Sequence, residues 1–102
     1  METYNEIKDF YENQKKLGAI GMVVIDMTPG THTTPVLRIP IKGNPNDFKK
    51  KAVDEMNSFL ARWNHGKPQN HQVDSREFDV KETQSDFGLP VITFTRTNGI
   101  HG

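Results

Sequence analysis

The chain has 102 residues, enough for one domain but not for two with separate cores. Only 33% of the residues are hydrophobic and 25% are charged, so we expect a thin core and two layers rather than three. The 13 basic and 13 acidic residues cancel. This balance argues against a basic nucleic-acid binder and against an acidic mimic of DNA, since each needs a strong charge of one sign.

Cysteine is absent, which excludes disulfides, thiolate zinc sites and a cysteine nucleophile. The start of the chain, METYNEIKDFYENQKK, lacks the apolar run of a signal peptide. No stretch reaches the roughly 20 apolar residues of a membrane helix. We therefore expect a soluble, cytoplasmic protein with no membrane partner.

The first half of the chain predicts a helix and two strands. Residues 4–17 carry apolar side chains at helical spacing, and Gly18 ends the pattern. Residues 19–27, AIGMVVIDM, are almost all apolar, which is typical of a short strand buried on both sides. Residues 36–42 alternate apolar and polar side chains, and Pro40 cannot donate to a ladder, so this strand should lie at a sheet edge.

A second helix is predicted over residues 46–64. Asn44 is a suitable N-cap, and Pro45 suits the first helical position. At about 100° per residue, one apolar stripe runs along this helix. It consists of Phe48, Ala52, Met56, Phe59, Leu60 and Trp63.

The last third predicts a hairpin of two strands, residues 77–83 and 91–97, joined by the turn QSDFGLP. The alternating apolar positions are Phe78, Val80, Ile92 and Phe94. The whole chain is thus an α+β domain in the order αββαββ, spanning residues 1–102. We expect a two-layer sandwich, with a four-stranded, mainly antiparallel sheet and both helices on one face. The most apolar strands should be central, giving the spatial order 36–42, 19–27, 91–97, 77–83.

The Thr-rich stretch DMTPGTHTTP is the first candidate site. Its hydroxyls could hold a small phosphate-containing ligand such as a nucleotide, and the residues proposed for this are Thr31, His32, Thr33 and Thr34. His32-Thr33-Thr34 resembles the His-x-Thr element of two-histidine phosphoesterases, which need two copies. No second copy is present, and a hairpin loop is the simpler interpretation.

Two further polar clusters are candidate sites. His65, His71 and Asp74 are competent zinc ligands, but their spacing matches no standard site, so we predict no metal and no cofactor. The Lys49–Lys51 region could contact nucleic acid, but helical spacing scatters the three lysines around the helix. No serine has a nucleophile-elbow context, so the protein is predicted not to be an enzyme and no catalytic residue is assigned.

The sheet face that the helices leave bare is the preferred site. If Val23, Ile25 and Met27 point towards the helices, the alternate residues of that strand point away. An apolar centre ringed by polar groups is typical of a docking surface. The residues predicted to bind a partner there are Ile20, Met22, Val24, Arg38, Lys42, Thr93 and Thr95.

From these features we expect a small non-enzymatic binding module that acts on a protein partner as an inhibitor or adaptor. It would use the exposed sheet face, and it could form a homodimer. Two alternatives stay open: nucleotide binding by the Thr-rich loop, and nucleic-acid binding through Lys49–Lys51. The C-terminal tail or the 64–76 loop could instead fold across the side of the 19–27 strand that points away from the helices. In that case the preferred site would be buried.

Overall fold

The computed structural model describes residues 3–27 and 36–97. Along the chain the elements are α1 (Tyr4–Lys16), β1 (Ala19–Asp26), β2 (Leu37–Lys42), α2 (Phe48–Asn64), β3 (Phe78–Gln84) and β4 (Pro90–Arg96). Every predicted helix and strand is present, within two residues of its predicted ends. The largest difference is at α2, which a 3₁₀-helical turn precedes, with the Asn44 side chain accepting a hydrogen bond from the Asn46 N–H.

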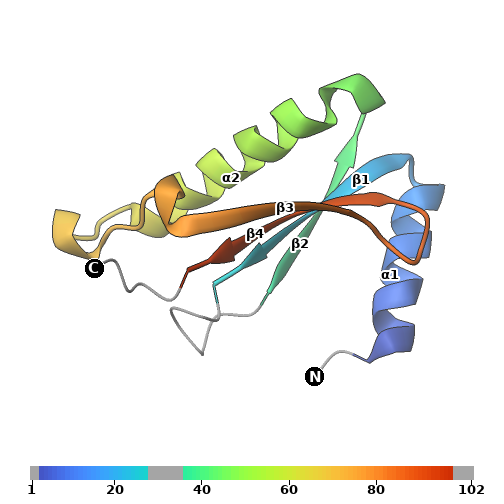
Figure 1. Cartoon of the computed structure of the whole chain (residues 1–102), viewed down its shortest axis with the longest axis horizontal. Helices are drawn as coiled ribbons and strands as arrows, with labels where there is room; N and C mark the ends of the chain where they lie inside the picture. Colours follow the sequence, from blue (N-terminus) through green and yellow to red (C-terminus); the bar gives the residue numbers. More distant parts are fainter. Residues whose placement is uncertain (1–2, 28–35, 98–102) are drawn as a thin grey trace.

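The four strands form one sheet in the order β2-β1-β4-β3, which agrees with the predicted order (Figure 1). β1 pairs antiparallel with β2, and β3 with β4, but β1 and β4 run parallel. The predicted mainly antiparallel sheet is therefore a mixed sheet. The reason is that α2 carries the chain back along the sheet, so that β3 begins at the end where β1 finishes and β4 then runs in the same direction as β1.

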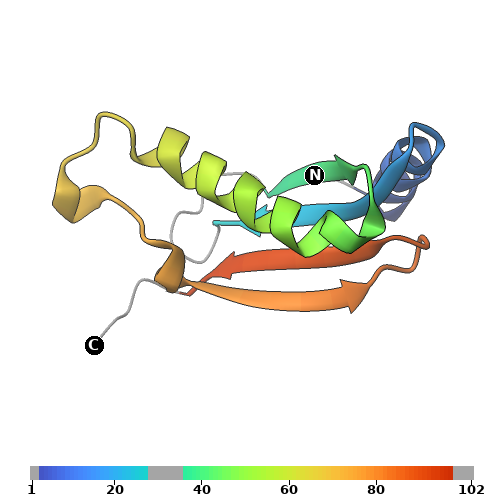
Figure 2. The ribbon, with the colours of Figure 1, turned by 90° about the horizontal axis from the view of Figure 1, so that it is seen from above.

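The two helices pack against opposite faces of the sheet, with α2 above and α1 below the sheet in Figure 1 and α2 in front of it in Figure 2; this corrects the expectation that both lie on one face. Val23 and Ile25 of β1 belong to the core under α2, whereas Met22 packs with Tyr11 of α1. Successive side chains of a strand point to opposite faces, so these contacts place the helices on different sides. Only Leu17 and Gly18 separate α1 from β1, and this short turn holds α1 against the first residues of β1.

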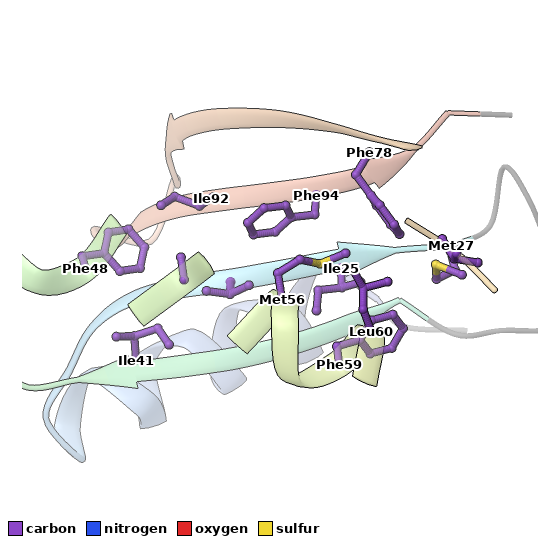
Figure 3. Close-up of a cluster of buried hydrophobic side chains, with 13 residues drawn as sticks. Ile25, Met27, Ile41, Phe48, Met56, Phe59, Leu60, Phe78, Ile92 and Phe94 are labelled. Carbon is purple, nitrogen blue, oxygen red and sulfur yellow. The ribbon is translucent and has the colours of Figure 1, made fainter. Parts of the chain in front are cut away.

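The larger cluster, which we call the α2 core, lies between α2 and the sheet (Figure 3). The predicted stripe of α2 faces this core; Phe48, Ala52, Met56, Phe59 and Leu60 are all buried, and Trp63 is partly buried. Burial of each of the Phe, Met and Leu side chains in this stripe stabilises the fold by about 1.5–3 kcal/mol.

The smaller cluster, the α1 cluster, lies on the other face and contains four buried residues, Tyr11, Met22, Leu89 and Val91. Aromatic rings bind α1 to the β3–β4 turn: the Phe87 ring lies 5.5 Å from the Tyr4 ring and 5.0 Å from the Tyr11 ring, between centroids. Lys15 Nζ also donates a hydrogen bond to the Phe87 carbonyl at 3.3 Å. These contacts hold α1 at one end of its sheet face, and the side chains on the rest of that face are mostly polar.

Candidate functional site

Beyond α1, the sheet face opposite α2 carries side chains from all four strands. We call this surface the open sheet face. Its residues are Val24, Asp26, Arg38, Asp79, Lys81, Thr93 and Thr95. The five on β1, β2 and β4 are half-buried, and Asp79 and Lys81 on β3 are exposed.

The strand register arranges this face in two rows. Val24 pairs with Arg38 on one side and with Thr93 on the other, and Lys81 follows opposite Thr93. In the next row Thr95 lies between Asp26 and Asp79. The two cations and two carboxylates balance, so the open sheet face has no excess charge for a polyphosphate ligand. Its hydroxyls, carboxylates and cations suit hydrogen bonding to another protein instead.

Four of the predicted partner-binding residues, Val24, Arg38, Thr93 and Thr95, lie together on this face. Met22 does not, although its side chain points the same way. It is 0% exposed because the α1 cluster covers it. The predicted apolar centre is thus occupied by α1, and a more polar surface is left open.

Ile20 and Lys42 also lie elsewhere. Ile20 packs against the α2 core rather than pointing away from it, because the β1–β2 register shifts between Ala19 and Gly21 and reverses the side of that residue. Lys42 is exposed at the end of β2, where its carbonyl accepts a hydrogen bond from Lys51 Nζ at 2.8 Å. Neither residue belongs to the open sheet face.

The Thr-rich loop residues Thr31, His32, Thr33 and Thr34 lie outside the described residues. His65 and His71, the two histidines weighed as zinc ligands, are exposed. In the described parts of the chain, no three His, Asp or Glu side chains gather closely enough to hold a metal ion.

The three lysines of the Lys49–Lys51 region point to different places. Lys49 Nζ lies 3.4 Å from the Glu82 carboxylate on β3, and Lys51 reaches the end of β2. Lys50 is exposed between them. A phosphate backbone needs several cations on one side, which this arrangement does not provide.

Sequence reasoning missed a groove between α2 and β3. It has a volume of about 170 Å³ and is lined by Lys49, Ala52, Val53, Val80, Glu82, Ile92 and Phe94. Val53 is 51% exposed and Val80 is 60% exposed, although Val80 lies on the sheet face that α2 covers elsewhere. The only sequence signal was Val53, an apolar residue beside the main stripe of α2.

A polar cleft of about 390 Å³ lies between the end of α2 and the loop that follows. Its amide and carboxylate groups already bind the chain's own backbone. Asn64 donates to the Val73 carbonyl and accepts from the Val73 N–H, at 2.8 and 2.7 Å. Asp74 accepts from the Arg76 side chain and backbone, and these hydrogen bonds lower the pKa of Asp74. We therefore assign this cleft a structural role.

The same loop does not cover the open sheet face. Val73 is buried in the α2 core, which places the middle of the loop on the other side of the sheet. The C-terminal residues 98–102 lie outside the described part of the chain.

No protein family, curated protein or solved structure matches this chain in the three comparisons made. The described residues include no helix that could cross a membrane, since α2, the longer helix, has 17 residues and several charges.

Proposed function

We propose that this protein is a small non-enzymatic binding module that acts on a protein partner, as an inhibitor or adaptor, through its open sheet face. The observation that supports this is the limited reach of α1. It packs over Met22 and Val91; Val24 packs against the margin of this cluster, and the sheet beyond carries half-buried Thr93 and Thr95.

The composition of the face favours a protein over a nucleic acid. Balanced charges and the hydroxyls of Thr93 and Thr95 match the polar character of a non-obligate protein interface. The separated lysines of α2 give no continuous cationic surface, so nucleic-acid binding has no support from the described residues.

Affinity capture from cells that make the protein, with variant baits, tests the proposal. Thr93→Arg and Thr95→Arg each place a long charged side chain in the middle of the face, and each should weaken capture about tenfold or more. Asn57→Arg on the exposed side of α2 is the matched control and should capture the partner as well as the wild type. If all three baits retain the same partner equally, the open sheet face is not the binding surface.

A thermal-shift screen distinguishes nucleotide binding by the Thr-rich loop from protein binding by the open sheet face. A nucleotide present at 100 times its dissociation constant should stabilise the protein by about 2.7 kcal/mol. Such a shift, lost in His32→Ala and Thr34→Ala, would favour the Thr-rich loop over the sheet face.

A further inference from the structure

β3 is the last strand of the sheet, and its outer side is exposed. Every residue from Asp79 to Gln84 is exposed, in contrast to β2, the other edge, where most residues are half-buried. No described element pairs with this outer side. A strand edge of this kind is a template for pairing with another strand.

Backbone groups of the even-numbered residues face outward. Just outside the two ends of β3, Glu77 O accepts from Thr97 N–H at 2.8 Å, and Ser85 N–H donates to Leu89 O at 2.9 Å. The backbone groups of these odd-numbered residues therefore point towards β4. Bonding direction alternates along an antiparallel pair. The N–H and C=O groups of Val80 therefore point to the open edge.

Two of the side chains beside this edge, on the α2 side of the sheet, are apolar and exposed. Val80 and Val53 are more than half exposed and line the groove between β3 and α2. An isolated chain leaves these two residues in contact with water, and a strand laid along β3 would cover them.

We infer that β3 pairs antiparallel with β3 of a second copy of this chain, about a twofold axis at Val80. This goes beyond the proposed function, because it uses the outer edge of β3 and, of the open sheet face, only Asp79 and Lys81 at its margin. In this register Val80 faces Val80 of the second copy. Asp79 of each copy faces Lys81 of the other copy, so the twofold axis creates two pairs of opposite charges.

The charge pattern of β3 selects this register. A twofold axis at Asp79, Lys81 or Glu82 would place a charged side chain directly opposite its own copy, which is unfavourable. Only the axis at Val80 avoids this and also pairs opposite charges. The Asp79 and Lys81 side chains would meet at a pair without mutual hydrogen bonds, where side chains are closest.

Charges on an edge strand ordinarily oppose pairing, so their arrangement matters. Glu82 is compensated within the chain by Lys49, at 3.4 Å. Asp79 and Lys81 remain on the opposite side of β3 and are complementary across the twofold axis. The product is a continuous eight-stranded sheet, in which the open sheet faces of both copies lie on the same side.

Single-cysteine variants test the register, since the chain has no cysteine of its own. Paired residues across the axis have Cα atoms about 5.5 Å apart, within the range of a disulfide. Val80→Cys should therefore give a covalent dimer when oxidised with diamide. Glu82→Cys is the matched control on the same edge; its two copies would be offset by four residues, about 14 Å, and should not cross-link.

Charge exchange tests the interface itself by sedimentation velocity. Wild type should dimerise, and Lys81→Asp or Asp79→Lys alone should each weaken association about tenfold or more. A mixture of the two variants should restore the dimer, because each substituted side chain then faces an opposite charge. Circular dichroism of each variant verifies that it is folded.

The inference is overturned if the wild type stays monomeric up to about 1 mM, or if it dimerises regardless of both charge reversals. Equal cross-linking of the Val80→Cys and Glu82→Cys variants would also overturn it. Monomeric wild type would leave the edge to an extended segment of another protein. None of these results affects the proposed function, whose variants Thr93→Arg and Thr95→Arg lie on β4.

Discussion

On β1, Met22 and Ile25 are both 0% exposed, yet they are covered by different helices. Ile25 lies in the α2 core, which extends along the sheet under the whole length of α2. Met22 lies in the α1 cluster, which has only four buried residues at one end of the opposite face. A strand that is apolar on both sides thus indicates that both faces of the sheet are buried at that strand. It does not show how much of each face a helix covers.

The largest expected effect compares these two residues directly. Ile25→Ala and Met22→Ala should each reduce the free energy of unfolding by about 2–5 kcal/mol. We expect the larger loss for Ile25, because the residues around Met22 belong to a small cluster that can close more easily around a cavity. Urea unfolding of both variants measures the difference; an equal or larger loss for Met22→Ala would show that the two faces are equally well held.

Gly21 tests how tightly α2 packs at the start of its core. A Cβ at this position would lie 2.5 Å from the Phe48 ring, so Gly21→Ala should cost about 1–3 kcal/mol. Adding Phe48→Leu should recover part of that loss, because the smaller side chain leaves room for the methyl group. Strictly additive losses in urea unfolding would contradict this packing.

Asn64 tests how the far end of α2 is held. Its side chain satisfies both backbone groups of Val73, which is buried, so Asn64→Ala should cost about 1–3 kcal/mol. Asn57→Ala, on the exposed side of the same helix, should change stability by less than about 0.5 kcal/mol. Similar losses for the two variants would indicate a helix-propensity effect only.

Phe87 tests the attachment of α1. Phe87→Leu keeps an apolar side chain but removes the ring contacts with Tyr4 and Tyr11, at a cost of about 0.5–1.5 kcal/mol. Hydrogen exchange should become faster in α1 and stay unchanged in α2. Equal acceleration in both helices would show that the two faces open together.

The smallest expected effect concerns pH and the loop after α2. The hydrogen bonds from Arg76 keep the pKa of Asp74 below its ordinary value in the folded protein. The carboxylate therefore contributes stability above its unfolded-state pKa, and this contribution is lost as the pH falls through the lower folded-state pKa. An NMR titration should show the lowered pKa, and Arg76→Gln should move it back towards the ordinary value.

Local patterns predicted most of the fold. The helical stripe of α2 and the alternation of β2 and β4 depend on neighbouring residues, so their ends could be read from the sequence. The strand order followed from which strands are most apolar. Four residues of the candidate site, Val24, Arg38, Thr93 and Thr95, were placed correctly on one face because side chains alternate along a strand.

The remaining features depend on contacts between distant segments. The sequence cannot show that α1 covers Met22, that the register shift turns Ile20 towards α2, or that α2 leaves Val80 exposed, because each results from where a helix lies on the sheet. The parallel pairing of β1 and β4 likewise depends on the direction in which α2 returns the chain. The sequence by itself determined the elements and the sides of their residues through local periodicity. Only the tertiary structure decided which of those sides are covered, since coverage depends on packing between elements far apart in the chain.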